Sequence, residues 1–156
     1  MEKKQEQIEI SYRIIKIHTT KFTCEDSSEE RIDVLFNNMD GLGLNIEATL
    51  NVDNEKSIIT IDIGTELIDK ENGMALVEHS GRTSYHLQGL NKFYNKDKNA
   101  YDLPDDLALQ FYSFAYTHAR ALLAAEISPT VYKDKYILPV IDPSNFIKST
   151  KKEVTK

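Results

Sequence analysis

The stretch LGLNIEATLNV, residues 42–52, alternates apolar and polar residues without a break. A period of two gives a strand one apolar face and one wet face. The same alternation returns at 59–67 and again at 74–90. Asn72 and Gly73, between the last two runs, supply the positive φ angles of a tight hairpin turn. The pattern therefore predicts three consecutive antiparallel strands, with Glu47, Asp62, Glu66 and Glu78 on their wet face.

Residues 8–24 predict a first strand that contains an irregularity. The apolar residues change parity between Ile14 and Ile15 and return to the first parity at Phe22. Such a change of phase is typical of a bulge or a strong bend. The following segment, 25–41, begins with a charged and polar run, so we expect a loop or crossover that packs back on the domain.

One long helix is expected after a polar connection at 91–102. Pro104 suits the first helical position, Asp105 and Asp106 favour the positive end of the helix dipole, and Ser128-Pro129 ends the helix after Ile127. Its apolar stripe, predicted to cover the sheet, consists of Leu107, Phe111, Phe114, Ala115, His118, Ala121, Leu122 and Ala125. The helix is apolar beyond that stripe at Tyr112, Tyr116, Ala119 and Leu123, which indicates burial in an oligomer.

The C-terminal region predicts a short second helix. Asp142-Pro143-Ser144 resembles an N-cap followed by proline, and the helix would continue through Phe146 and Ile147. We expect residues 1–156 to form a single domain, with frayed ends at 1–7 and 149–156.

The composition excludes several classes of protein. The net charge of −6 disfavours nucleic-acid binding, because the lysines are scattered among acids and form no basic stripe. No apolar run reaches the length of a membrane span and the first residues contain no signal-peptide core, which predicts a cytoplasmic protein. A single cysteine, Cys24, excludes an intrachain disulfide and a CxxC motif.

The residues that could carry chemistry form no recognisable catalytic set. His79 and His86 are seven positions apart on one predicted strand, so they point to opposite faces and cannot share a metal by strand geometry. No nucleophile elbow, HExxH, P-loop or dinucleotide motif is present. We therefore expect no enzyme, no metal and no cofactor.

Several short motifs, in this order along the chain, resemble the SecB family of export chaperones. They are RIIKIHTTKFTCE at 13–25, SYHLQGL at 84–90, YTHAR at 116–120, LPV at 138–140 and SNF at 144–146. Lys21 departs from the family, whose typical members carry there an acidic residue that contacts the translocase motor SecA. This departure favours a diverged member or one dedicated to a particular client.

The resemblance implies an α+β fold with a four-stranded antiparallel sheet, one long helix and a short C-terminal helix. It implies a homotetramer, built as a dimer of dimers, that holds unfolded or extended client polypeptides without ATP. The client-binding groove would include Phe22, Leu35, Phe36, Tyr112, Tyr116, Phe146 and Ile147. An acidic outer face, which would meet SecA or a dedicated protein partner, would include Glu25, Asp26, Glu47, Asp62 and Glu78.

Two alternatives stay open at the level of sequence. The holdase could serve protein export in general or a dedicated client such as the antitoxin of a toxin–antitoxin system. A protein of a different class, an oligomeric α+β domain without catalysis, would instead bind a small apolar ligand between helix and sheet.

Overall fold

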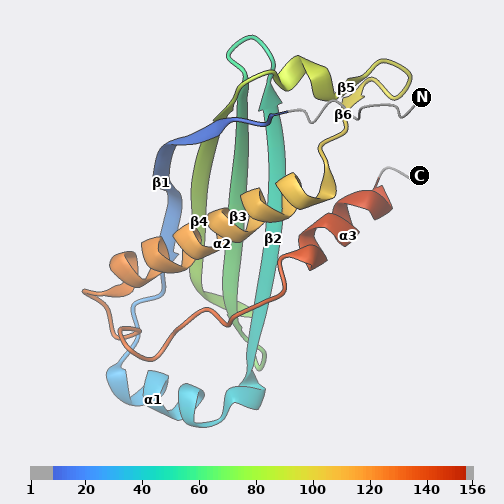
Figure 1. Cartoon of the computed structure of the whole chain (residues 1–156). Coiled ribbons are helices and arrows are strands. Elements are labelled where there is room, and N and C mark those ends of the chain that lie inside the picture. Colours follow the sequence, from blue (N-terminus) through green and yellow to red (C-terminus); the bar gives the residue numbers. More distant parts are fainter. Residues whose placement is uncertain (1–8, 154–156) are drawn as a thin grey trace, which may run out of the picture.

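The computed structural model describes residues 9–153, and its main feature is one antiparallel sheet crossed by a long helix (Figure 1). The elements in chain order are β1 (Tyr12–Cys24), α1 (Glu29–Asn37), η1 (Met39–Gly41), β2 (Leu42–Asp53), β3 (Ile58–Asp69), β4 (Met74–Leu87), η2 (Leu90–Phe93), β5 (Tyr94–Asn95), β6 (Ala100–Tyr101), α2 (Asp105–Ile127) and α3 (Ser144–Glu153). The four long strands form a sheet of order β1-β4-β3-β2. This architecture confirms the predicted α+β class.

The helix α2 packs on one face of the sheet, which we call the inner face (Figure 1). The opposite, outer face is polar. Ile59, Ile61 and Ile63 of β3 point inward and are completely buried. On β4 the inner face includes Gly81, where a Cβ would lie 3.2 Å from the backbone of Ala119. Glycine at this position therefore lets α2 approach the sheet closely.

The predicted irregularity in the first strand is confirmed. β1 pairs with β4 along its length, and its register shifts between Ile14 and Lys16 and again between Thr19 and Lys21. Each shift inserts an extra residue, so the side chains change face twice along the strand. The two changes of parity in the sequence mark these two places.

The segment 25–41 differs from the predicted loop, because it contains the helix α1. The Ser28 side chain caps this helix by accepting a hydrogen bond from the Arg31 backbone N–H at 3.3 Å. Ile32 is completely buried, while Leu35 and Phe36 are half-buried on the same side, at the i, i+3, i+4 spacing of an amphipathic helix. The polar run in front of these residues obscured the helical pattern. Packing back on the domain, as expected, is confirmed.

The predicted stripe of α2 does meet the sheet in part: Phe111 stacks on Tyr85, and His118 contacts Thr83. Leu107, Phe111 and Ala115 are buried as expected, but Phe114, Ala121 and Ala125 are exposed. Tyr112, Tyr116, Ala119 and Leu123, which were expected to be buried in an oligomer, are instead buried within this chain. Because α2 is apolar around most of its circumference, the pattern alone could not show how far the buried surface extends beyond the side that meets the sheet.

Smaller differences concern turns and ends. The third predicted run ends as β4 at Leu87 rather than at residue 90, and a register shift between Leu67 and Ile68 interrupts its regular pairing with β3. The connection 91–102 holds the short β5–β6 hairpin. α3 continues past Ile147 to Glu153, so its last turns occupy part of the segment predicted to be frayed. Residues 1–7, also predicted to be frayed, lie outside the described residues.

Candidate binding surfaces

Three of the predicted groove residues form one aromatic cluster between α2 and α3. The ring of Phe146 lies 5.6 Å from the ring of Tyr112 and 6.1 Å from that of Tyr116. All three side chains are buried. The Tyr116 hydroxyl donates to the Pro139 carbonyl at 2.6 Å, so α2 also holds the extended segment that leads to α3. Phe146 thus closes the space beside the two tyrosines.

The other predicted groove residues lie elsewhere. Phe22 is on β1, opposite His79 of β4, while Leu35 and Phe36 are on α1 beyond the end of the sheet (Figure 1). Ile147 follows Phe146 on α3 and is half-buried. The predicted set is therefore spread over several places on the inner side of the molecule.

A row of apolar side chains on β2 was expected to be covered but is only half-buried. The helix α2 packs mainly on β4, β3 and β1. The row consists of Leu44, Ile46, Ala48, Leu50 and Val52, which face the inner side in register with buried residues of β3. We call it the β2 row. The alternation in the sequence placed these residues on one face of β2, but it could not show that α2 would pack mainly on the other three strands.

A second apolar surface follows the opposite edge of the sheet. Ile14, Ile15 and Ile17 of β1 and Phe114 of α2 are each between 40 and 43% exposed. We call these four residues the β1 strip. Large apolar side chains that gather at an edge are typical of protein–protein contact surfaces.

The predicted acidic outer face is largely neutralised by ion pairs. Glu47, Asp62 and Glu78 do share the outer face. Arg82 binds both carboxylate oxygens of Asp62, at 2.7 and 2.9 Å. Lys21 donates to Glu78 at 3.1 Å, and this bond is the main reason why the pKa of Glu78 lies below its ordinary value. A hollow of about 730 Å³ on this face is lined by Lys21, Leu44, Asn45, Ile46, Glu47, Gly64, Thr65, Glu66, Glu78, His79 and Ser80.

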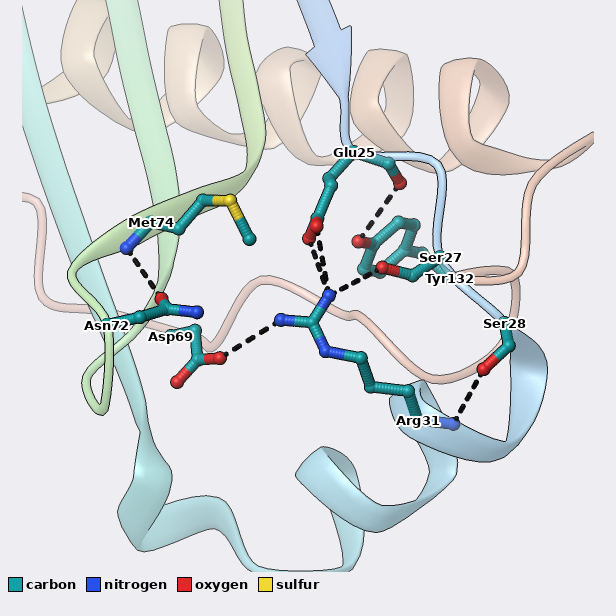
Figure 2. Close-up of polar contacts among 8 residues, drawn as sticks. All are labelled: Glu25, Ser27, Ser28, Arg31, Asp69, Asn72, Met74 and Tyr132. Atoms are coloured by element: carbon teal, nitrogen blue, oxygen red, sulfur yellow. Dashed lines mark hydrogen bonds and ion pairs between the residues drawn. The ribbon is translucent and has the colours of Figure 1, made fainter.

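The other two acids predicted for the outer face lie beyond the end of β1. Glu25 belongs to a polar cluster around Arg31, which also binds Ser27 and the buried carboxylate of Asp69 (Figure 2). The Tyr132 hydroxyl donates to the Glu25 carbonyl at 3.3 Å in the same cluster. Asp26 is exposed. The role of Glu25 seen here is to fix α1 and the segment after α2 against the end of the sheet.

His79 and His118 occupy structural positions between the sheet and α2. His79 is 2% exposed and contacts the Thr19 hydroxyl at 3.1 Å, and the ring of His118 contacts the Thr83 hydroxyl at 3.0 Å. Burial lowers the pKa of both imidazoles. Neither contact supplies the acid, base and nucleophile of a catalytic set. The residues described include no group of three or more His, Cys, Asp or Glu side chains that could hold a metal.

No helix within residues 9–153 is both long enough and apolar enough to cross a membrane.

We compared the chain with protein families, curated proteins and solved structures. No family model matches the sequence, and no curated protein matches it. Among solved structures, the chain is similar to the Mycobacterium tuberculosis Rv1957 SecB-like chaperone in complex with a ChAD peptide from the Rv1956 HigA1 antitoxin. That match has a TM-score of 0.53 at 10% identity and covers 83% of this chain and 87% of the other. The chain therefore has a SecB-like fold.

A second solved structure is a protein of unknown function from Streptococcus agalactiae. It matches with a TM-score of 0.42 at 10% identity, over 85% of this chain and 99% of that one.

Proposed function

We propose that this protein is an ATP-independent holdase chaperone that binds unfolded or extended client polypeptides. The observation that carries the proposal is the β2 row, which is only partly buried because α2 packs mainly on β4, β3 and β1. A domain with a fully buried inner layer would offer a client nothing apolar to bind. The SecB-like fold, shared with a chaperone solved with an antitoxin peptide, supports this function.

The client surface would combine the β2 row with the predicted groove residues. Phe22, Leu35, Phe36 and Ile147 are already half-buried rather than enclosed. Tyr112, Tyr116 and Phe146 would join the surface when α3 moves away from α2 and a client aromatic side chain replaces Phe146. The segment before α3 adds two exposed apolar residues, Ile137 and Val140.

The proposal extends to assembly and partners. A homotetramer, built as a dimer of dimers, would bury the β1 strip between copies. The protein would act in the cytoplasm, either in protein export or for a dedicated client such as an antitoxin. The Lys21–Glu78 ion pair favours the dedicated role over a contact with SecA, because it neutralises one of the acids predicted to meet that partner.

The test is suppression of aggregation without nucleotide. A urea-unfolded apolar client is diluted into the protein, aggregation is followed by light scattering, and the mass of the complex is measured after size exclusion. We expect a tetramer that carries the client in its own peak and keeps it soluble.

The variant Ile46→Asp/Leu50→Asp, on the β2 row, should lose most of this protection. Thr49→Asp, on the outer face of the same strand, is the matched control and should keep it. A double variant that protects as well as the parent would contradict the proposed surface. A monomer that ignores the client, but melts at a higher temperature with a small apolar ligand, would favour the ligand-binding alternative.

A further inference from the structure

The outward edge of β2 is a free strand edge. Each residue of Leu42–Asp53 pairs with β3 in unbroken register, from Leu42 opposite Asp69 to Asp53 opposite Ile58. β2 is the last strand in the sheet order, so within residues 9–153 no strand pairs with its other side. Alternate backbone N–H and C=O groups therefore point away from the sheet along the whole strand.

The two edges of the sheet differ in how they are protected. Natural proteins block exposed edges with bulges, lysines or proline, because a free edge is a template for another strand. β1 has two register shifts and carries Lys16 and Lys21. β2 has no register shift, no lysine and no proline. The protein thus leaves β2 open and disrupts β1.

The side chains of β2 define what a strand beside it must carry. On the inner face the neighbour would meet the β2 row, which favours apolar residues at alternate positions. On the outer face it would meet Glu47, which has no cationic partner in the described part of the chain. The Glu47 side chain lies over Gly64, where a Cβ would be only 3.1 Å from its Cγ. A lysine or arginine on the neighbouring strand would complement this carboxylate.

We propose that β2 captures its client by strand addition. The occupant is an extended peptide segment with apolar residues at alternate positions and at least one lysine or arginine on the other side, beside Glu47. The backbone hydrogen bonds would bind any sequence, while the β2 row and Glu47 would select this pattern. The inference rests on the proposed holdase function and gives the form in which the client is held.

The experiment uses the full chain and a labelled nine-residue peptide that alternates valine with threonine and lysine. Its affinity is measured by fluorescence anisotropy and compared with two versions that are N-methylated at the odd or at the even positions. Strand addition uses the backbone groups on one edge of the peptide only. We expect one methylated version to bind about tenfold more weakly or worse, since it loses several hydrogen bonds. The other version should bind like the parent peptide.

Charge reversal tests the selecting contact. Glu47→Lys should weaken the lysine peptide by about fivefold and strengthen a version with glutamate in place of lysine. Glu55→Lys, in the turn after β2, is the matched control and should change neither affinity. Equal effects of the two variants would overturn the role of Glu47.

The results separate this inference from the proposed function. Two methylated peptides that bind like the parent, or a parent peptide that does not bind while aggregation is still suppressed, would overturn strand addition and leave the holdase intact. If the protein is a dimer joined through β2, and the β2 amides exchange slowly even without peptide, then a second copy of the chain occupies the edge. A protein that neither suppresses aggregation nor binds the peptide would overturn both.

Discussion

The two halves of the inner face are built in different ways. Beside β1 and β4, Tyr85 is stacked on Phe111 at 4.3 Å, and Tyr12 meets Phe111 edge-on at 4.8 Å. The Tyr85 hydroxyl donates to the Phe111 carbonyl at 2.7 Å, which joins the sheet to α2. Beside β2 the apolar residues of the β2 row are only half-buried. One half therefore completes the core, while the other half offers apolar surface.

The difference follows from where α2 passes. Figure 1 shows α2 crossing the sheet diagonally, with α3 on the β2 side of it. Close approach is possible at Gly81 of β4, where a larger residue would meet Ala119. α2 packs mainly on β4, β3 and β1, so the apolar residues of β2 are only partly buried and contribute less to stability than their number suggests. This partly buried row is the surface on which the proposed function rests.

The same substitution in the two halves should separate stability from binding. Leu87→Ala, on the covered side, removes a completely buried side chain. It should lower the free energy of unfolding by about 3 kcal/mol, because the lost burial is joined by a cavity. Urea unfolding followed by circular dichroism measures the loss. A loss below about 1 kcal/mol would show that the covered half is not the main core.

Leu50→Ala, on the β2 row, is the corresponding change on the open side. Since Leu50 is half-buried, we expect a loss of about 1 kcal/mol in the same urea experiment. Under conditions where both variants are folded, Leu50→Ala should bind an unfolded client more weakly than the parent protein. Leu87→Ala should bind the client as the parent does. Equal losses of stability in the two variants would remove the distinction between the halves.

The strand pattern was readable from the sequence because each feature depends on neighbouring residues. The alternation of 42–52 fixed both faces of β2, and the changes of parity at Ile15 and Phe22 marked the shifts in β1. The outer positions of Glu47, Asp62 and Glu78 followed from the same period of two. Their ion pairs with Arg82 and Lys21 did not, because cross-strand pairing depends on the register between strands.

The features that could not be predicted from the sequence depend on contacts between distant segments. The full extent of the buried surface of α2 could not be predicted, because Phe114 and Tyr112 are equally suited to burial and only the packing of α3 covers Tyr112. Glu25 was expected on the outer face, yet it pairs with Arg31 of α1 beyond the end of the sheet (Figure 2). Phe146, Tyr112 and Tyr116 were expected near one another and do lie together, but the burial of their rings between α2 and α3 depends on packing between distant segments.

The smallest effect we expect is a pH dependence that belongs to the covered half. His79 lies between Thr19 of β1 and Glu126 of α2, and burial lowers its pKa from the ordinary 6.5 although the charge of Glu126 opposes the shift. The Nδ1 atom of His79 is buried without a hydrogen-bond partner, so a proton placed there would gain no acceptor. Burial lowers the pKa of His118 in the same direction.

Below pH 6.5 the unfolded chain takes up protons at these histidines before the folded protein does. The contribution of these histidines to the free energy of unfolding should therefore be fully present above that pH and should decrease as the pH falls below it. Urea unfolding at about pH 7.5, 6.5 and 5.5 measures the slope, and the double variant His79→Gln/His118→Gln should reduce it. A slope that the double variant leaves unchanged would show that the titrating groups lie outside the covered half. Acid would then not act specifically on the contact between α2 and β4.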